Sequence, residues 1–243
     1  MSADNHVPHA DGKWAFDASV TDNFDDMLKA SIPEYKSMRE LTYYIGRNFL
    51  HLHGNVVDIG ASRGEALAPF VADQAYLCDY HALEISEPML DVLRTRFDNG
   101  QKVKVHPTDL RKITNASPGL SENESCLILS ILTLQFTPIE YRSRILRTLY
   151  HAVKPGGCFL FVEKILGNTP DIDELLVKEY YEMKNRNGYS YEDIERKKAS
   201  LEGVLVPMTD NWNREMLRSA GFDQVDCYYR SMNFAGYMAI KDR

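Results

Sequence analysis

The chain has 243 residues, a formal net charge of −7, 44% apolar residues and 26% charged residues. These proportions are ordinary for a globular protein, and the acidic balance argues against bulk nucleic-acid binding but not against a specific tRNA contact. No apolar run reaches the roughly 18 residues of a membrane span, and the N-terminus carries no signal pattern, so we expect a cytoplasmic protein without membrane partners. The four scattered cysteines lack a C-x-x-C pair and predict neither disulfides nor zinc.

The first 13 residues are polar and predict a loose tail, which contains His6 and His9 but no metal site that we expect. From Trp14 onward, apolar residues at helical spacing predict two amphipathic helices, separated by a break at Ser31–Tyr35. This leader precedes the first strand and could lie over its carboxyl end. Tyr35 then either reaches a ligand site or packs within the leader.

The stretch Asn55–Gly64, with the sequence NVVDIGASRG, predicts a strand, a glycine turn and the start of a helix. Gly60 lets the backbone turn sharply beside a ligand, because glycine has no Cβ. The spacing is G-x-x-x-G, and Ser62 stands where a dinucleotide-binding turn would place a second glycine. The stretch therefore indicates a nucleotide-like ligand, and an ordinary strand-to-helix turn is the alternative.

Two acidic residues stand at the carboxyl ends of later predicted strands. Glu84 lies in the strand His81–Ile85, about 20 residues after Gly60, where a carboxylate either accepts both ribose hydroxyls or is a solvated glutamate at the strand end. Asp109 follows the strand Lys102–His106 and either accepts a hydrogen bond from an adenine amino group or caps a short helix. Because parallel strands end at the same edge of a sheet, these side chains and Gly60 should converge on one ligand.

The next elements continue the alternation of strands and helices. The apolar run Ser125–Leu134 predicts a buried strand, and Ile139–Val153 predicts a helix that carries Arg142 and two further arginines on a solvated face. The turn after this helix leads into a second buried strand, Cys158–Ile165. This order predicts a parallel, doubly wound sheet.

The last third of the chain departs from that order. Residues 169–205 predict two helices, a candidate lid with a basic face formed by Arg196, Lys197 and Lys198, for which an ordinary solvated helix face is the alternative. A helix over Thr209–Ala220, with Trp212 facing inward, precedes an antiparallel hairpin. We therefore predict one α/β domain over residues 14–243. It is a Rossmann-like, mostly parallel sheet of seven strands with a closing antiparallel hairpin, an N-terminal helical leader and a helical insert.

A sheet of this kind, with one glycine turn, Asp58 before it and acids at Glu84 and Asp109, resembles the class I S-adenosylmethionine methyltransferase superfamily. From about Trp14 to the C-terminus the chain is also similar to carboxy-S-adenosylmethionine synthases. The similar strings are Trp14–Asp17 with Val20, Ser31–Tyr35, Leu132–Phe136, Glu163-Lys164, Arg186–Ser190, Lys197–Val204 and Met232–Phe234.

The resemblance implies that the cofactor is S-adenosylmethionine or its carboxylated form. The resembled family makes the carboxylated form from S-adenosylmethionine and prephenate for tRNA wobble-uridine modification, and the likeness suggests a homodimer. The family's cofactor contacts fall on Tyr35, Gly60, Ala61, Ser62, Glu84, Ile85, Asp109 and Leu110.

This sequence departs from the family pattern at two positions that matter for the carboxylated cofactor. The family's asparagine before the LTLQF string falls on Ile131, whose side chain forms no hydrogen bond. The family's arginine that holds the extra carboxylate falls on Lys198, which keeps the charge but loses the bidentate fork. Glu84 also replaces an aspartate, which is a smaller change.

Three functions remain open from the sequence. The first is a methyltransferase acting on a small-molecule acceptor, in which orientation and exclusion of water do most of the work. Tyr189 or Glu163 could then serve as a base, and Phe136, Tyr181 and Phe234 either wall the acceptor pocket or pack in the core. The second is carboxy-S-adenosylmethionine synthesis from prephenate, with Lys198 supplied by a partner subunit. The third is a non-catalytic protein that binds S-adenosylmethionine.

Overall fold

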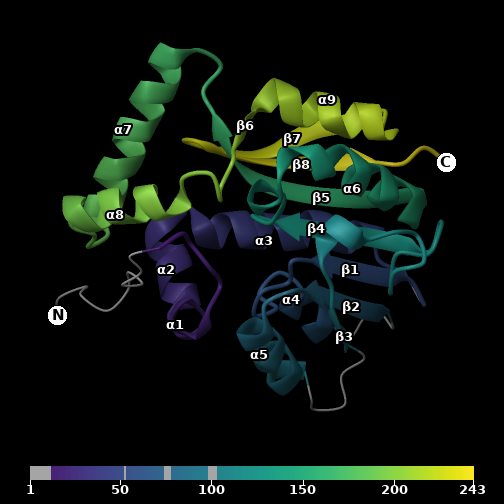
Figure 1. Cartoon of the computed structure of the whole chain (residues 1–243). Helices are drawn as coiled ribbons and strands as arrows, with labels where there is room; N and C mark the ends of the chain where they lie inside the picture. Colours follow the sequence, from purple (N-terminus) through teal and green to yellow (C-terminus); the bar gives the residue numbers. More distant parts are fainter. Residues whose placement is uncertain (1–11, 52, 74–77, 98–102) are drawn as a thin grey trace.

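The computed structural model describes residues 12–51, 53–73, 78–97 and 103–243 (Figure 1). Most of the predicted N-terminal tail, including His6 and His9, lies outside the described residues.

An eight-stranded sheet forms the centre of the described chain. Its strands are β1 (Asn55–Ile59), β2 (Asp79–Glu84), β3 (Val103–Pro107), β4 (Ser125–Ile131), β5 (Val153–Leu166), β6 (Met208–Thr209), β7 (Gln224–Ser231) and β8 (Phe234–Ile240). The order is β3-β2-β1-β4-β5-β8-β7, with β6 paired to β5 off this path. β1 to β5 are parallel and β8 is antiparallel to both neighbours. The predicted mostly parallel sheet with a closing hairpin is confirmed, and two-residue β6, too short to leave a sequence pattern, is the eighth strand.

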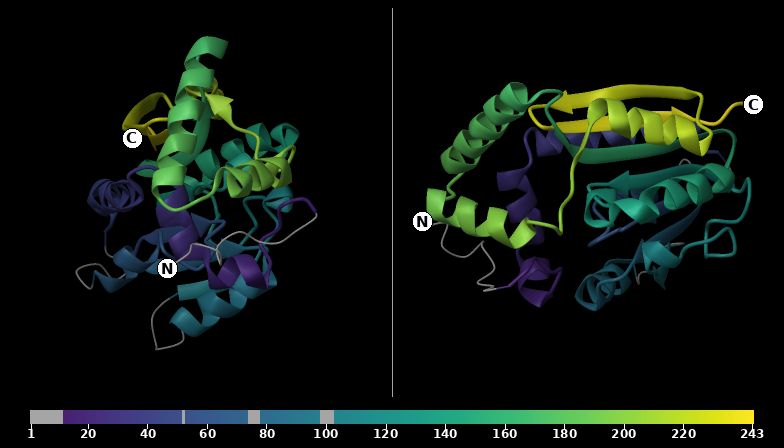
Figure 2. Two further views of the ribbon diagram at one scale, coloured as in Figure 1. Left: turned by 90° about the vertical axis from the view of Figure 1, so that its left-hand side faces the viewer. Right: turned by 45° about the horizontal axis from the view of Figure 1, so that its top comes forward.

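Helices cover both faces of the sheet (Figures 1 and 2). They are α1 (Ala18–Asp22), α2 (Phe24–Ser31), α3 (Tyr35–Gly46), α4 (Ala68–Ala72), α5 (Glu87–Phe97), α6 (Ile139–Ala152), α7 (Pro170–Arg186), α8 (Tyr191–Leu201) and α9 (Asp210–Ala220), with 3₁₀ turns η1 (Arg47–Phe49), η2 (Leu110–Lys112) and η3 (Leu134–Phe136). One core packs α6 and α9 against the sheet, and a second packs α3, α4 and α5 against the opposite face. In β4, Ile128 joins the first core while Leu127 and Leu129 join the second, which is why that strand is a continuous apolar run.

The leader and the insert meet beyond the carboxyl ends of the strands. The backbone N–H of Trp14 donates to the carbonyl of Ser200 at 2.9 Å, and the Asn187 side chain donates to the carbonyl of Ala30 at 3.1 Å. Helix α7 projects away from the sheet, and α8 crosses beside the leader helices (Figures 1 and 2). These two segments therefore form a wall on the side of the sheet where ligands of such folds bind.

The helix predicted directly after the glycine turn begins later than expected. Residues 61–67 form turns and bends after Ala61, and α4 runs only from Ala68 to Ala72. The positive φ angles of Ser62 (49°) and Gly64 (83°) are incompatible with a right-handed helix at that point. A ligand beside Gly60 therefore does not meet the start of a helix, and the N–H groups of Gly60, Ala61 and Ser62 already donate to acceptors within the protein.

Arg142, predicted on a solvated face, is in fact buried. Its side chain is 2% exposed, and its guanidinium donates to the carbonyls of Thr137 at 2.8 Å and Gln135 at 3.2 Å. The turn before α6 folds back over the first part of the helix and covers this arginine.

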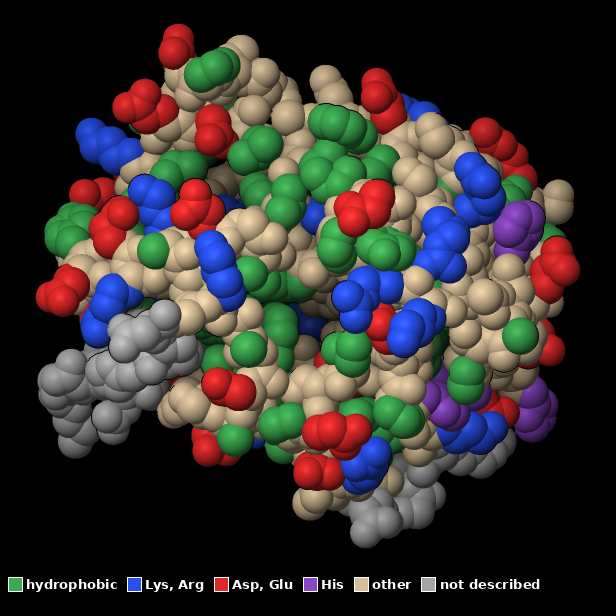
Figure 3. All heavy atoms as spheres, in the orientation of Figure 1, with side chains coloured by type: hydrophobic (Ala, Val, Ile, Leu, Met, Phe, Trp, Pro, Cys, Tyr) green, Lys and Arg blue, Asp and Glu red, His purple; other side chains and the backbone are tan. Residues whose placement is uncertain are grey.

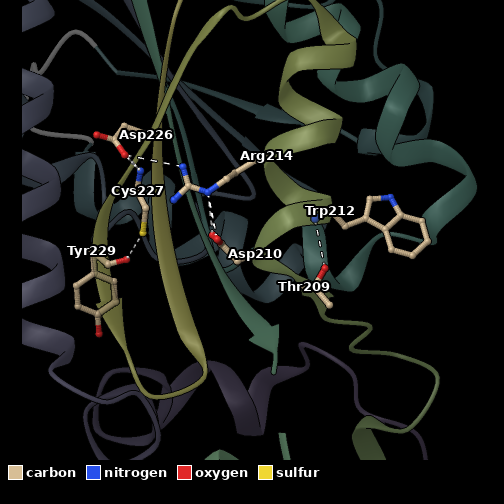
Figure 4. Close-up of polar contacts among 7 residues, drawn as sticks. All are labelled: Thr209, Asp210, Trp212, Arg214, Asp226, Cys227 and Tyr229. Atoms are coloured by element: carbon tan, nitrogen blue, oxygen red, sulfur yellow. Dashed lines mark hydrogen bonds and ion pairs between the residues drawn. The ribbon is translucent and has the colours of Figure 1, made fainter. Parts of the chain in front are cut away.

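Trp212, predicted to face inward, is 52% exposed. The buried stripe of α9 runs through Asn213, Met216, Leu217 and Ala220, so Trp212 lies one residue, or about 100°, off that stripe. The close-up in Figure 4 shows Trp212 pointing away from the hairpin. Arg214 instead reaches Asp210 at 3.1 Å and Asp226 on β7 at 3.8 Å.

Candidate functional site

The glycine turn at the end of β1 is closely packed. Gly60 has a φ of +67°, and a Cβ added to it would lie 2.2 Å from Cγ2 of Thr133. The N–H groups of Gly60 and Ala61 both donate to the carbonyl of Leu83, at 2.7 and 3.0 Å. The turn is thus fixed from both sides, by β2 and by the segment after β4, and no side chain fits at Gly60.

Glu84 at the end of β2 holds this turn in place. Its carboxylate is 7% exposed and accepts hydrogen bonds from the backbone N–H groups of Ser62 at 2.8 Å, Ile85 at 2.8 Å and Ser86 at 2.9 Å. Three of its roughly four acceptor positions are therefore used by the backbone. The longer glutamate reaches across to the turn, which leaves about one position for a ligand hydroxyl.

Asp109 is occupied by its neighbour Arg111. The carboxylate accepts from the Arg111 backbone N–H at 2.9 Å and from the guanidinium Nε and Nη2, each at 2.9 Å, so it caps η2. These hydrogen bonds lower the pKa of Asp109. The helix-cap alternative therefore describes the geometry, and a contact with adenine stays a prediction.

The strand ends open into one cavity of about 750 Å³. Every predicted cofactor-binding residue except Lys198 lines it, namely Tyr35, Asp58, Gly60, Ala61, Ser62, Glu84, Ile85, Asp109, Leu110 and Ile131. The leader and insert supply its far end, including Ser31, Tyr180 and Lys197. Figure 3 shows this face of the molecule hollowed between those segments and the sheet, with lysine or arginine atoms visible at depth.

Three lysines from different elements, which we call the lysine cluster, lie near one another: Lys164 (β5) and Lys197 (α8) line the far end of the cavity, and Lys184 (α7) lies near them without lining it. Lys184 is 4% exposed, Lys197 is 7% exposed and Lys164 is partly buried. Burial lowers the pKa of Lys164 and Lys184 to about 8 and that of Lys197 well below its usual value of 10.5, and the lysines repel one another. Among the described residues, no carboxylate forms an ion pair with any of the three.

The ammonium groups of the lysine cluster contact aromatic rings and one hydroxyl in place of carboxylates. The ammonium of Lys164 lies 4.8 Å from the ring centre of Tyr180, and that of Lys184 lies 4.6 Å from the ring centre of Tyr189. Lys197 donates to Oγ of Ser31 at 3.3 Å. Such contacts are worth about 1–2 kcal/mol each and do not compensate fully for burying an ammonium group. The arrangement is suited to an anion that enters the cavity.

Two further charged groups of the cavity have unpaired buried atoms. Oδ2 of Asp58 and Nη2 of Arg39 are both inaccessible to solvent and lack a hydrogen-bond partner. Asp58 is 1% exposed, and burial raises its pKa to about 8. A ligand that offers a hydrogen-bond donor to Asp58 and an acceptor to Arg39 would satisfy both atoms.

Several predicted residues lie outside this cavity. Tyr189 is 5% exposed and accepts a hydrogen bond from Ser31 at 3.1 Å, which places its hydroxyl behind the cavity wall. Glu163 is 3% exposed, and burial raises its pKa to about 8, but it does not line the cavity either. Lys198 is exposed and pairs with Glu195 at 3.4 Å.

Of the three aromatic residues predicted as walls, Phe136 and Phe234 line the cavity and Tyr181 does not. Sequence reasoning did not single out Arg39, treated Lys164 only as part of a longer string, and named Lys197 only as part of the basic face of the candidate lid. Lys164 stands at the end of β5 and could have been found by the same strand-end rule that selected Glu84. Arg39 lies four residues after Tyr35, one turn further along the same helix.

In the described part of the chain, no cluster of three His, Cys, Asp or Glu residues could hold a metal ion. No described helix has the length and apolar character to cross a membrane. Cys78, Cys126, Cys158 and Cys227 are all free thiols.

Comparison with known proteins agrees with the geometry. A family model described as a methyltransferase domain matches residues 56–157. The chain is 33% identical to the carboxy-S-adenosyl-L-methionine synthase of Staphylococcus epidermidis, over 94% of this chain and 97% of the relative. It is 34% identical to the enzyme of the same name from Methylococcus capsulatus, over 94% of this chain and 93% of the relative.

Solved structures share the fold. A putative S-adenosylmethionine-dependent methyltransferase from Methanococcus maripaludis matches with a TM-score of 0.59 and 19% identity, over 96% of this chain and 97% of the other. Human N-acetylserotonin methyltransferase in complex with S-adenosylmethionine matches with a TM-score of 0.61 and 16% identity, over 93% of this chain and 56% of the other.

Proposed function

The chain belongs to the carboxy-S-adenosylmethionine synthase family of S-adenosylmethionine-dependent transferases, and from this premise we propose that it carboxylates S-adenosylmethionine with prephenate as the donor. In that reaction S-adenosylmethionine supplies the methyl carbon that gains the carboxyl group. Prephenate gives up carbon dioxide and its ring hydroxyl, and the hydroxyl leaves as water with the proton lost from the methyl carbon.

The observation that carries this proposal is the lysine cluster at the far end of the cavity. Prephenate bears two carboxylates, and Lys164 and Lys197 both line the cavity without a carboxylate partner among the described residues. Two buried ammonium groups become favourable when two anionic groups bind beside them, because opposite charges attract strongly where water is excluded. A neutral methyl acceptor would leave this positive charge uncompensated.

The other residues of the cavity have roles that follow from their position. The turn at Gly60 and the carboxylate of Glu84 fit the nucleoside part of S-adenosylmethionine, close to the strand ends. The leader and insert close the cavity from above, so that the donor meets the methyl group away from bulk water. Lys164 and Lys197 orient the bound donor before one of its two carboxylates leaves as carbon dioxide.

This proposal reverses the order in which the sequence alone placed the two reactions. Methyl transfer to an anionic small molecule is the second candidate, and Ile131 favours it. This side chain lines the cavity at the end of β4 where the resembled family has an asparagine, so one polar contact to an added carboxylate is absent.

Lys198 faces outward from its own cavity. We propose that it serves the cavity of a second copy in a homodimer.

Product analysis separates the two reactions. The protein is incubated with S-adenosylmethionine, with and without prephenate, and the nucleoside products are weighed by mass spectrometry. Carboxylation predicts a product heavier than S-adenosylmethionine by one carbon dioxide, formed only with prephenate. S-Adenosylhomocysteine formed from an added anionic acceptor, with no heavier product, would refute the proposal in favour of methyl transfer.

A pair of variants tests the observation that carries the proposal. Lys197→Met removes one buried ammonium, and we expect the KM for prephenate to rise about 10- to 100-fold, since a hydrogen bond to a charged group is worth about 1.5–3 kcal/mol. The affinity for S-adenosylhomocysteine should stay unchanged. Lys178→Met, on the exposed side of α7, is the matched control and should behave like the unaltered protein.

A further inference from the structure

The starting point is the indole N–H of Trp14, at the far end of the cavity. Trp14 lines the cavity, yet its Nε1 is inaccessible to solvent and has no hydrogen-bond partner. A buried tryptophan N–H usually donates to an acceptor, because burial without one is unfavourable. The position therefore calls for an acceptor that arrives with a ligand.

The Trp14 side chain is fixed by its surroundings. Its backbone N–H donates to the carbonyl of Ser200 at 2.9 Å, which joins the leader to the insert. Its ring packs edge-on against Phe16, with 6.1 Å between the ring centres, and Phe16 packs edge-on against Phe136 at 5.0 Å. A ring held in this way loses little further conformational freedom when a ligand binds, which favours binding.

Lys197 lies beside Trp14 and also has N–H groups to spare. Its ammonium is 5.1 Å from the centre of the Trp14 ring and donates to Oγ of Ser31 at 3.3 Å. An ammonium group has three N–H donors, and this hydrogen bond uses one of them. Because no carboxylate among the described residues pairs with Lys197, its charge is available to an anion.

Two other polar side chains that line the cavity are already engaged. The hydroxyl of Ser31 donates to the hydroxyl of Tyr189 at 3.1 Å and accepts from Lys197. The Gln135 side chain accepts from the backbone N–H of Lys164 at 2.7 Å and donates to a backbone carbonyl at 3.4 Å. The spare groups beside Trp14 are therefore donors, and they suit a ligand group that only accepts, such as a carboxylate.

We propose that Trp14 and Lys197 form a subsite for a 2-oxo acid group, in which the indole N–H and the ammonium both donate to its carboxylate. The inference rests on the proposed function, because the side chain of prephenate ends in such a group. Prephenate carries its other carboxylate on the ring, and only that one leaves as carbon dioxide. The subsite then holds the carboxylate that stays in the product, phenylpyruvate.

Position favours this assignment of the two carboxylates. The ring carboxylate has to meet the methyl carbon of the cofactor, which the proposed function places at the strand ends, where Lys164 also stands. Trp14 and Lys197 belong to the leader and the insert, which meet beyond those ends. The side chain of the donor therefore points toward Trp14 and Lys197 when its ring carboxylate lies beside the cofactor.

Charge favours the same assignment. A carboxylate that leaves as carbon dioxide loses its charge on the way to the transition state. Tight contacts with an ammonium group and an N–H would stabilise the bound donor more than that transition state, which slows the reaction. The 2-oxo acid carboxylate keeps its charge throughout, so it can be held tightly without this effect.

Three ligands that differ in their carboxylates test the subsite in the intact protein loaded with S-adenosylhomocysteine. Phenylpyruvate carries only the side-chain carboxylate, phenylacetone keeps the ketone but lacks that carboxylate, and 1-methylcyclohexa-2,5-diene-1-carboxylate carries only the ring carboxylate. Their dissociation constants are measured by calorimetry. Phenylpyruvate should bind about 10- to 100-fold more tightly than phenylacetone, and more tightly than the ring carboxylate.

Two variants assign the groups. Trp14→Phe keeps an aromatic ring without the N–H and should weaken phenylpyruvate about 10-fold, with the other ligands and S-adenosylhomocysteine within about twofold. Lys197→Met should weaken phenylpyruvate about 10- to 100-fold. In turnover, the KM for prephenate should rise by the factor found for phenylpyruvate while kcat stays within about threefold. Trp212→Phe, at a position that is 52% exposed, is the matched control and should change none of these values.

Unchanged phenylpyruvate binding in Trp14→Phe, or a loss for the ring carboxylate instead, would overturn the subsite. An equal loss for all three ligands would make Trp14 a packing residue and overturn it as well. If Trp14→Phe does not fold, Trp212→Phe decides, because Trp14 is then the one tryptophan of the chain. Phenylpyruvate should shift its emission maximum and the ring carboxylate should not, whereas equal shifts or none exclude the subsite. The proposed function fails separately, when no carboxylated product forms although phenylpyruvate binds with these preferences.

Discussion

Replacement of Lys184 by methionine should affect stability and function in opposite directions. Lys184 is 4% exposed on α7, and its ammonium lies 4.6 Å from the ring centre of Tyr189 and 5.8 Å from that of Tyr180. It has no ion-pair partner among the described residues. We expect Lys184→Met to raise the free energy of unfolding of the ligand-free protein, because an uncompensated buried charge is removed. We also expect it to raise the KM for prephenate, because the ammonium of Lys184 adds positive charge beside Lys164 and Lys197, which line the cavity.

The size of the stability gain follows from the pKa. Burial lowers the pKa of Lys184 from 10.5 to about 8, and Lys164 lowers it further. At about 1.4 kcal/mol per unit, holding this ammonium in the folded state at pH 7 costs at most about 3 kcal/mol. Loss of the contacts with the two tyrosine rings reduces the expected gain in stability by about 1 kcal/mol. The unbranched methionine fits the vacated space, so the net gain should be about 1–3 kcal/mol.

The pH dependence gives the result that can refute this reasoning. The folded-state pKa lies below the unfolded-state pKa, so between pH 8 and 10.5 the unfolded chain binds more protons. The stability advantage of Lys184→Met should thus be complete below pH 8 and vanish by about pH 10.5. Urea unfolding at pH 7 and pH 10 measures it, with Lys178→Met on the same helix as the control. A destabilised variant at pH 7, or a difference that does not change with pH, would show that Lys184 is not a buried, uncompensated charge.

Three further outcomes are expected. Gly60→Ala should lower the free energy of unfolding by about 2 kcal/mol or more, because its Cβ would overlap Thr133 at a positive φ. Gly203→Ala, at a φ of +74° with open space around it, should lower it by about 1 kcal/mol. Urea unfolding measures both, and equal losses would contradict the packing argument. Tyr189→Phe should keep kcat within about fivefold, since its hydroxyl lies outside the cavity, and a loss of about a hundredfold would restore it as a general base. The KM for prephenate should rise above pH 8 as Lys164 loses its proton, while the affinity for S-adenosylhomocysteine stays level from pH 7 to 9; a flat KM would remove the lysine from donor binding.

The sheet and the side of it that carries the cavity could be predicted because both follow from backbone periodicity. Gly60, Glu84 and Asp109 stand at the ends of three parallel strands, and that topology alone brings them to one edge. What each carboxylate does there could not be predicted. Glu84 holds the glycine turn and Asp109 holds Arg111, because hydrogen-bond partners are selected by local reach and not by position along the sheet.

The far end of the cavity was predictable only in part, since it depends on which side of a helix faces inward. The resemblance directed attention to Lys198, yet its neighbour Lys197 enters the cavity of the same chain. Successive residues of a helix point about 100° apart, so an assignment shifted by one residue exchanges a buried ammonium for an exposed one. The same shift explains why Trp212 is exposed while Asn213 is buried.

The protein is acidic overall, whereas the far end of its cavity carries positive charge. The chain carries a net charge of −7, yet its lysine cluster gathers three ammonium groups from three elements that are distant in sequence. Only the folded chain brings them together, and their mutual repulsion then acts against folding. An anion that binds in the cavity offsets this destabilisation, because its negative charge reduces the repulsion between the lysines and compensates for their burial. The positive charge therefore indicates that the far end of the cavity receives an anionic substrate.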